Sequence, residues 1–403
     1  MGKEKNNNFF LKNTKLSGYK SVIDIDINFK EGLNIIIGKN AAGKTNFLTL
    51  LSNVLEYSFD DLLNFSSSLS FKNGKEILVE SASEIEKEDL ISSNIFTATK
   101  VKSIVKIDGV LIEDTKDNKG ELDAKIKESG LLYSSTFVRH GIPENFYLVD
   151  SPFSFKVDKK GFPSDFFKQI GEQETPYFVK SLLAGFLFSS LITNEGESLN
   201  EEVIKERLLT AFNRINKIKD SVVKYSPIED IRYNKNFNIF LDEDREKYSI
   251  NNIFIEFKVD GNWHPFSNLS DGTKRLFYII AEVAYSDGFH YSKSSFGFHT
   301  KDINRIILLE EPELGVHPHQ LKKLMDFLND ESKRKQIIIT THSPQILDVL
   351  NPEELDRIIL AYSTSVTEGT KLRHLEDSEI SKALKYLEED FLSDYWKYSD
   401  LEK

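Results

Sequence analysis

The sequence contains no cysteine and no apolar run long enough to cross a bilayer. Without cysteine the chain can form neither disulfides nor thiolate zinc sites, which fits a reducing compartment. A membrane-spanning helix needs ~20 consecutive apolar residues, and the polar segment Met1 to Asn8 has no apolar signal core. We therefore expect a cytoplasmic protein with no membrane partner.

An excess of positive charge is also missing. The 52 lysines and arginines face 64 aspartates and glutamates, so the formal net charge is −12. The surface as a whole therefore does not attract nucleic acid, and any contact with DNA or RNA needs a local basic strip. The length of 403 residues, 39% of them hydrophobic, is enough for a large core and favours two lobes.

Strands and helices are predicted to alternate at the two ends of the chain. The apolar runs Leu33–Ile37, Ile306–Leu309 and Ile337–Thr340 are typical of buried strands. Helical spacing follows the first run and also separates the other two, as in Leu321 and Leu324. Buried strands alternating with helices indicate an α/β fold with a largely parallel sheet.

The middle of the chain is richer in charged residues, serine and asparagine, and it predicts a long inserted region. We expect a strand-rich first part and a helical second part within residues 59–262. The two segments 1–58 and 263–373 then form one domain, and 374–403 forms a C-terminal helix. The sequence has no fixed-period repeat and no sustained heptad, so we expect no long coiled-coil arm.

A glycine-rich turn directly follows the first buried strand and fits G-x-x-x-x-G-K-[ST] without a mismatch. In such a loop the glycines let backbone N–H groups turn toward phosphates, and the following helix N-terminus favours negative charge. Lys44 reaches the β- and γ-phosphate oxygens, and the Thr45 hydroxyl ligates Mg²⁺. The predicted ATP-binding residues are Gly38, Lys39, Asn40, Ala41, Ala42, Gly43, Lys44, Thr45 and Asn46.

Two carboxylates end the second buried run. Successive side chains of a strand point in opposite directions, so Glu310 can hold Mg²⁺ while Glu311 polarises the attacking water. Alone, two acids at a strand end are often only solvated. The phosphate loop upstream favours the catalytic interpretation.

A second predicted anion site lies just before a helical pattern, in the motif Leu269, Ser270, Asp271 and Gly272. A small hydroxyl, a flexible glycine and a helix N-terminus together suit a phosphate. Because one loop already binds the triphosphate, this motif makes sense if it completes the γ-phosphate shell of a second subunit. Read alone, Ser-Asp-Gly is an ordinary capped turn.

His342 directly follows the third buried run, within Thr341-His342-Ser343-Pro344. A histidine at the carboxyl edge of such a sheet can sense the γ-phosphate and orient water. Together Glu311, His342 and Lys44 are the predicted catalytic residues, and Thr45 and Glu310 are the predicted metal ligands.

These motifs, in this order, resemble the ABC-type P-loop ATPases. Within that class, Leu309-Glu310-Glu311-Pro312-Glu313, His317-Pro318 and the His342 motif are similar to the stand-alone AAA-type ATPases of the overcoming-lysogenization-defect (OLD) and Septu-like group. The resemblance covers about residues 10–58 and 263–362. It implies ATP and Mg²⁺ as ligands, an ATP-bound homodimer and a role in bacterial anti-phage systems.

The sequence departs from that pattern in three places. Glu310 stands where transporter ATPases have aspartate, and Asp271 and Thr273 replace the usual glycine and glutamine. No glutamine can be assigned to the Q-loop. A strand predicted over Leu131–Val138, leading to Arg139-His140-Gly141, is the candidate for that region.

The sequence predicts no nuclease within this chain, because the Toprim nuclease of full-length OLD proteins needs a longer segment after His342. Two readings stay open: an ATPase subunit that controls a separate nuclease or toxin, and a RecF-like repair ATPase that clamps DNA by itself. A transporter subunit is a weaker third. The alternating charges between Lys205 and Lys219 form either a nucleic-acid strip or a solvated helix face. An apolar stripe from Ile380 to Tyr395 either docks a partner or packs on the chain's own core.

Overall fold

The computed structural model describes most of the chain, namely residues 9–56, 58–59, 62, 64–72, 76–84, 100–116, 133–141, 153–160, 198–234, 236–243, 245–284, 304–350, 352–363, 365, 367–389 and 392–394. The chain divides into two compact units. Unit 1 comprises Met1–His140, Asp302–Leu314 and Leu328–Lys403, and unit 2 comprises Gly141–Lys301 and Gly315–Phe327.

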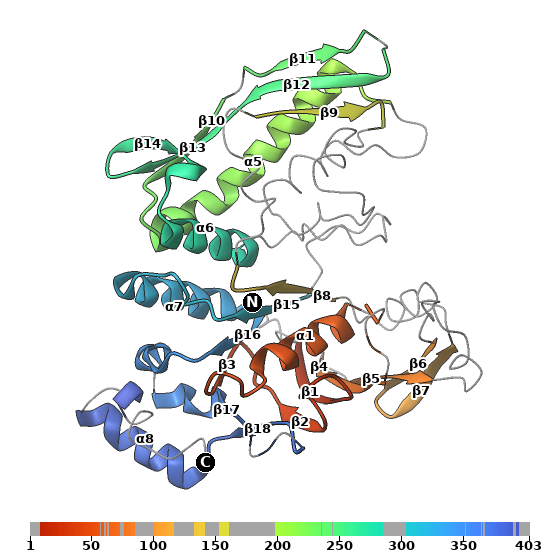
Figure 1. The fold of residues 1–403 in the computed structure, drawn as a ribbon, viewed down its shortest axis with the longest axis vertical. Helices are drawn as coiled ribbons and strands as arrows, with labels where there is room; N and C mark the ends of the chain where they lie inside the picture. Colours follow the sequence, from red (N-terminus) through yellow and green to blue (C-terminus); the bar gives the residue numbers. More distant parts are fainter. Residues whose placement is uncertain are drawn as a thin grey trace, which may run out of the picture. The chain divides into compact units, whose positions relative to one another are not determined.

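A largely parallel sheet with strand order β18-β17-β3-β16-β15-β8 forms the centre of unit 1 (Figure 1). Its strands are β3 (Leu33–Ile37), β8 (Tyr133–Val138), β15 (Asn304–Glu310), β16 (Gln336–Thr341), β17 (Ile358–Ser363) and β18 (Thr370–His374). The neighbours from β17 to β8 pair in parallel, and β18 pairs with β17 antiparallel. Every residue of β3 and β16 is buried, as expected for strands covered on both faces. The predicted parallel sheet is confirmed.

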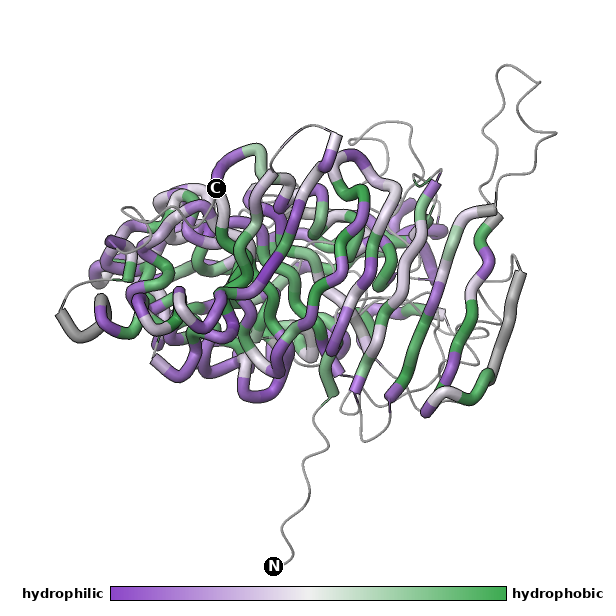
Figure 2. The backbone as a smooth tube through the Cα atoms, turned by 90° about the horizontal axis from the view of Figure 1, so that it is seen from below, coloured by the Kyte–Doolittle hydropathy of each residue, from purple (hydrophilic) through white to green (hydrophobic). Residues whose placement is uncertain are grey.

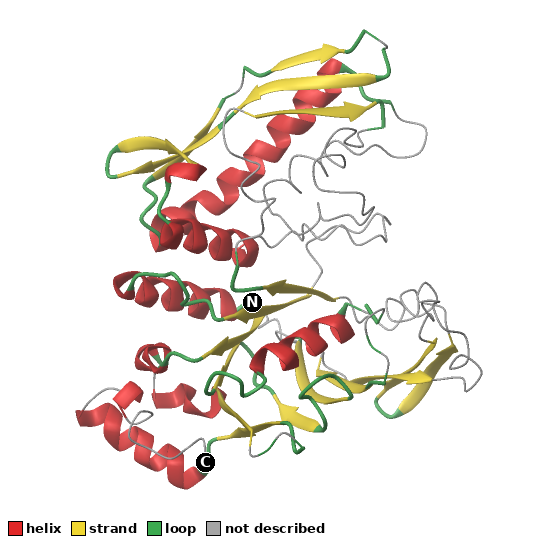
Figure 3. Cartoon of the chain, in the orientation of Figure 1, coloured by secondary structure: helices red, strands yellow, loops and turns green. Residues whose placement is uncertain are grey.

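Unit 1 also contains an antiparallel sheet with strand order β2-β1-β4-β5-β6-β7. Its strands are among those drawn in yellow in Figure 3. Its strands are β1 (Phe10–Ser17), β2 (Ile25–Asn28), β4 (Ser66–Lys72), β5 (Glu76–Glu84), β6 (Lys100–Ile107) and β7 (Val110–Lys116). Hydrophobic and hydrophilic residues intermix along the backbone (Figure 2). In β4, exposed and buried positions alternate. The strand-rich stretch expected after residue 59 thus extends the sheet of β1 and β2.

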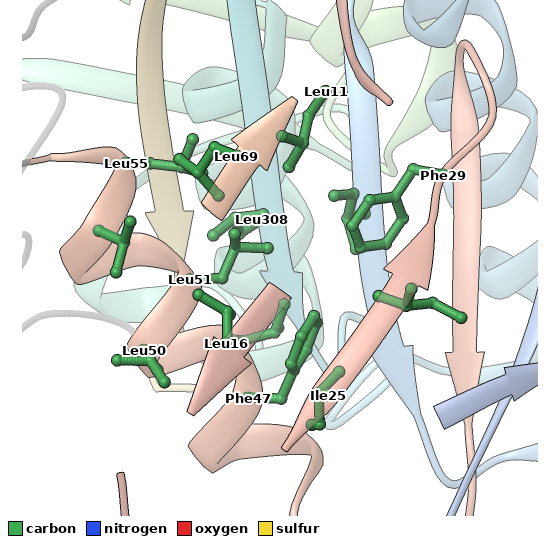
Figure 4. Close-up of a cluster of buried hydrophobic side chains, with 14 of the residues drawn as sticks. Leu11, Leu16, Ile25, Phe29, Phe47, Leu50, Leu51, Leu55, Leu69 and Leu308 are labelled. Carbon is green, nitrogen blue, oxygen red and sulfur yellow. The ribbon is translucent and has the colours of Figure 1, made fainter. Parts of the chain in front are cut away.

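The core of unit 1 lies around the helix α1 (Lys44–Leu55) and includes residues of both sheets (Figure 4). Phe47 and Leu51 of α1 are fully buried together with Leu16 of β1 and Leu308 of β15. Gln336, also buried, connects the two sheets: its side-chain amide accepts from the Leu11 N–H at 2.8 Å and donates to the Leu11 carbonyl at 2.9 Å. The core thus packs α1 against residues of both sheets.

Unit 2 contains two three-stranded antiparallel sheets with orders β10-β13-β14 and β11-β12-β9. Their strands are β9 (Phe153–Asp158), β10 (Asp230–Tyr233), β11 (Asn238–Leu241), β12 (Lys247–Ile253), β13 (Ile255–Val259) and β14 (Asn262–Pro265). Among the described residues of this unit, the helices are α5 (Glu201–Tyr225), α6 (Asp271–Ala284) and α7 (Pro318–Ser332), of which α7 continues into unit 1.

Where the sequence predicts a helical second part of the insertion, the described residues form the helix α5 and then the strands β10 to β14. A two-residue turn, Asp260-Gly261, joins β13 to β14, and both residues have positive φ, 48° and 77°. Asp-Gly is a strong hairpin signal because this turn type needs positive φ at both positions. The sequence carries this signal at Asp260-Gly261, within a stretch rich in charged residues.

The structure describes further short elements. They are the 3₁₀ turns η4 (Phe266–Asn268), η6 (Pro344–Val349) and η7 (Pro352–Arg357), and the helix α8 (Asp377–Glu389). On α8, Ile380 is half-buried and Leu384 is 36% exposed. Phe391 and Tyr395, the far end of the predicted apolar stripe, lie outside the described residues. None of the helices described is long and apolar enough to span a membrane.

Candidate active site

The predicted phosphate loop connects β3 to α1 at the carboxyl edge of the parallel sheet. Both of its glycines are enforced by their surroundings. A Cβ on Gly38 would lie 2.0 Å from the Ala361 carbonyl oxygen, and a Cβ on Gly43 would lie 1.8 Å from Thr370 Oγ1. Gly43 also has φ +86°, a conformation that L side chains rarely adopt. The loop therefore depends on both glycines for its path.

Lys44 begins α1 and is 5% exposed. Its ammonium group donates to the Gly38 carbonyl at 2.6 Å and to the Lys39 carbonyl at 2.9 Å. The lysine thus bonds to the backbone of its own loop. In nucleotide-bound loops of this type, the lysine ammonium donates to phosphate oxygens. Here the carbonyls of Gly38 and Lys39 accept in their place.

The other predicted ATP-binding residues surround the loop. Lys39, Asn40 and Ala41 are exposed, and Ala42 is buried. Asn46, on the first turn of α1, donates to Ser21 Oγ at 2.9 Å, and this hydroxyl lies 2.8 Å from Thr370 Oγ1. The hydroxyls of Ser21 and Thr370 thus support the start of α1, and no local sequence pattern predicts this contact.

Thr45 and Glu310, the two predicted metal ligands, come together. The Thr45 hydroxyl donates to Glu310 Oε1 at 2.5 Å, although the residues are 265 positions apart in sequence. A hydroxyl and a carboxylate are hard oxygen ligands of the kind Mg²⁺ binds. The donor set therefore fits this ion. Glu310 is 4% exposed, so its carboxylate is held where bulk water competes little.

His140 approaches the same carboxylate from β8. Its Nδ1 lies 3.2 Å from Glu310 Oε2, and its side chain is 62% exposed. Because β8 pairs in parallel with β15, the residues after β8 reach the same sheet edge as Glu310. The Arg139-His140 segment, the candidate for the Q-loop region, therefore lies at the sheet edge of Glu310 and presents a histidine near this acid.

Glu311, the predicted general base, contacts the predicted sensor His342. Glu311 Oε1 lies 3.2 Å from His342 Nδ1, and the two side chains are 20% and 36% exposed. Glu311 has φ +42°, which is uncommon for a residue with a side chain. Its N–H donates to the Thr340 carbonyl at 2.9 Å, and this bond at the end of β16 holds the strained turn.

Glu313 is a third acid of this edge, and its position was not predicted as functional. Its side chain is 8% exposed, its Oε1 accepts from Thr341 Oγ1 at 2.5 Å, and it lies 3.9 Å from His342 Nδ1. Burial raises the pKa of Glu313, and the Thr341 hydroxyl opposes that rise in part. In the sequence, the only indication that Glu313 belongs to the site is its place as the third acid of Glu-Glu-Pro-Glu.

The predicted trans-acting motif lies in unit 2. Leu269 is buried, Ser270 and Asp271 are exposed, and Asp271 begins α6. Ser270 Oγ accepts from the Thr273 N–H at 3.3 Å and lies 2.9 Å from Thr273 Oγ1. A Cβ on Gly272 would lie 2.6 Å from the Gly315 carbonyl oxygen. The motif is a capped helix start that only glycine lets pack so closely. Lys44, Thr45, Glu310, Glu311 and His342 all belong to unit 1, whereas Ser270 belongs to unit 2.

A family model described as "AAA domain, putative AbiEii toxin, Type IV TA system" matches residues 33–348, which include the phosphate loop, both acids and His342. The chain belongs to this AAA-domain family. Together with the parallel sheet and its phosphate loop, this membership confirms the predicted α/β P-loop ATPase fold.

Two curated relatives match over most of this chain. "Septu protein PtuA" of Bacillus thuringiensis is 23% identical over 368 residues, which cover 86% of this chain and 74% of PtuA. "Endonuclease GajA" of Bacillus cereus (strain HuB5-5) is 23% identical over 386 residues, which cover 80% of this chain and 53% of GajA. The chain thus spans about half the length of GajA. The predicted similarity to a Septu-like ATPase group is confirmed.

Among solved structures, the SMC head domain from Thermotoga maritima is 14% identical, with a TM-score of 0.45 over 91% of this chain and 99% of that chain. An SmcHead bound to the C-winged helix domain of ScpA is 16% identical, with a TM-score of 0.49 over 93% of this chain and 99% of that chain.

Proposed function

We propose that this AAA-domain chain binds and hydrolyses ATP with Mg²⁺. The supporting observation is the convergence of Lys44, Thr45, Glu310, Glu311 and His342 on one edge of the parallel sheet, although they come from α1, β15 and β16 and the turns after them. Such an edge, at the carboxyl ends of parallel strands, is where ligands bind in open α/β sheets.

Each residue then has a distinct role. The Lys44 ammonium exchanges its bonds to the Gly38 and Lys39 carbonyls for bonds to phosphate oxygens. Thr45 and Glu310 would hold Mg²⁺, which would neutralise charge on the phosphates. Glu311 turns from His342 to the attacking water and accepts its proton. His342 orients that water.

A binding and turnover assay tests this proposal. The wild-type chain should bind a fluorescent ATP analogue and release phosphate from ATP only with Mg²⁺. Lys44→Ala should lose both activities. Binding without any phosphate release, over a range of protein concentrations, would leave an ATP sensor instead of an ATPase.

We further propose that two copies enclose each ATP, as an ATP-dependent homodimer. The motif Leu269, Ser270, Asp271 and Gly272 supports this, because its capped helix start belongs to unit 2 while a complete phosphate loop belongs to unit 1. Such a spare anion site suits the γ-phosphate of a second copy. Light scattering of Glu311→Gln with and without ATP tests it: the dimer should form only with ATP.

The output we propose is control of a separate effector, a nuclease or toxin, in a bacterial anti-phage complex. The support is the similarity to PtuA and GajA, of which GajA is described as an endonuclease. Co-expression with its neighbouring genes, followed by purification, should recover an effector chain. A phage challenge of cells with and without Lys44→Ala should show protection only with the wild-type chain.

The second candidate function is a DNA clamp, and the exposed Lys205 and Lys217 on α5 favour it. Acids share that helix, however, and Lys219 is ion-paired with Asp230. Reversing Lys205, Lys217 and Arg207 should weaken DNA binding and flatten its salt dependence if α5 is the contact. Unchanged binding across salt would assign α5 to a solvated face.

A further inference from the structure

Glu313 has the most unusual environment of the three acids. Its side chain is almost fully enclosed, at 8% exposed. One oxygen, Oε1, accepts from Thr341, whereas the other, Oε2, is buried and has no hydrogen-bond partner among the residues that the structure describes. An enclosed carboxyl oxygen without a partner costs stability, so folding alone does not account for a glutamate here.

Thr341 connects Glu313 to the turn that carries His342. The Thr341 hydroxyl donates to Glu313 and accepts from the Ser343 N–H at 2.9 Å. Thr341 and Ser343, which make these bonds, stand directly before and after His342 in the sequence. Glu313 thereby fixes the backbone from which the imidazole projects.

The imidazole nitrogen Nδ1 faces two carboxylates. Glu311 Oε1 lies at 3.2 Å and Glu313 Oε1 at 3.9 Å. In this structure Glu311 is the nearer partner. If Glu311 turns away to the attacking water, His342 Nδ1 loses that partner, and Glu313 is the carboxylate within reach that replaces it.

We propose that Glu313 is a positioning residue for ATP hydrolysis: it fixes the His342 turn through Thr341 and takes over His342 Nδ1 when Glu311 moves to the water. This inference rests on the proposed ATPase function. No bond to ATP is assigned to Glu313, and its effect passes through His342. The raised pKa of Glu313 agrees with an acid held in an enclosed site for a purpose other than stability.

The test compares Glu313→Gln with a matched control, Glu379→Gln. Glutamine keeps the size of the side chain and an acceptor for Thr341, but it removes the negative charge facing His342. We expect kcat to fall at least about tenfold with KM for ATP changed by less than about threefold. The melting temperature should stay level or rise, because an enclosed carboxyl is replaced by a neutral amide. Glu379 pairs with Arg373 at 2.7 Å, and its substitution should leave kcat unchanged.

The His342→Ala background shows through which residue Glu313 acts. There, adding Glu313→Gln should lower kcat by no more than about twofold, because the residue it positions is gone. Equal fold losses in both backgrounds would overturn the proposal, and so would an unchanged kcat in the single variant. A lowered melting temperature with unchanged kcat would assign Glu313 to folding.

A second readout does not depend on turnover. In ¹⁵N-histidine NMR, with the His342 signal assigned by its loss in His342→Ala, Glu313→Gln should shift the His342 Nδ1 resonance and Glu379→Gln should not. If the wild-type chain hydrolyses no ATP, the proposed function fails, yet this shift still decides whether Glu313 acts on His342. An Nδ1 resonance that does not move in Glu313→Gln would overturn the contact.

Discussion

Replacing Glu311 by glutamine separates ATP binding from hydrolysis. The carboxylate lies 3.2 Å from His342 Nδ1 and is not one of the two oxygen groups that meet at the metal position. Glutamine has the same shape and adopts the same backbone. We therefore expect the closed ATP state to form and to persist, because the group that accepts the proton of water is lost.

The magnitude follows from the role assigned to this carboxylate. A positioned general base contributes about 10²- to 10⁴-fold, and each factor of ten corresponds to about 1.4 kcal/mol of activation free energy. Glu311→Gln should therefore lower kcat by at least about a hundredfold, a barrier increase of about 3 kcal/mol or more. The Kd for ATP should change little, since Lys44, Thr45 and Glu310 are intact.

Single-turnover phosphate release measures the chemical step, and fluorescent-ATP titration measures binding. The matched control is Glu310→Gln, which weakens the metal site beside Thr45 and should raise the Mg²⁺ concentration needed for binding. Phosphate release by Glu311→Gln at the wild-type rate would contradict our assignment of the two acids. So would a Glu310→Gln chain with unchanged Mg²⁺ dependence.

Three further predictions concern the scaffold of the site. Gly43→Ala should abolish ATP binding and lower the melting temperature, because its Cβ would lie 1.8 Å from Thr370 Oγ1 at a φ of +86°; retained binding in a titration would contradict this. Phe47→Ala should cost about 3–5 kcal/mol in urea unfolding, since the ring is fully buried, and a loss below about 1 kcal/mol would show that the core repacks. Burial lowers the pKa of Lys335 to about 8 despite Glu331, so the unfolded chain binds more protons between about pH 8 and 10.5, and this group makes stability rise with pH only in that window. Lys335→Met should remove that rise, of the order of 3 kcal/mol, from urea titrations at pH 8 and pH 10, and equal slopes for both chains would refute it.

Much of the site was predictable because its motifs are local. Continuous apolar runs predict the strand Leu33–Ile37 and the strand that ends in the acids after Leu309. Glycines predict the turn after Ile37. Thr45 lies on α1, just after β3, and Glu310 ends β15. Once β3 and β15 are placed in one parallel sheet, the contact between these residues, 265 positions apart, follows.

The features that escaped sequence analysis depend on pairings between distant segments. Ser21 supports α1 only because Thr370 lies beside it across 349 residues, and no local pattern indicates that. His140 reaches Glu310 because β8 pairs with β15, which needs the sheet order and not only the strands. The sequence shows Glu313 only as part of the Glu-Glu-Pro-Glu motif. Its burial and its hydrogen bond with Thr341 are visible only in the structure.

The most direct test of the account is to mix two inactive chains. Lys44→Ala lacks the lysine of the phosphate loop, and Ser270→Arg blocks the motif that we assign to the other copy. Each alone should release no phosphate from ATP. If two copies enclose ATP, their equimolar mixture contains heterodimers with one site that has an intact Lys44 and an intact Ser270, and hydrolysis should return to about a quarter of the wild-type rate when half of the dimers form as heterodimers with one working site each. A mixture as inactive as its components, with heterodimers demonstrated by co-purification of two different tags, would contradict the shared site, and a Ser270→Arg chain that is fully active alone would contradict it as well.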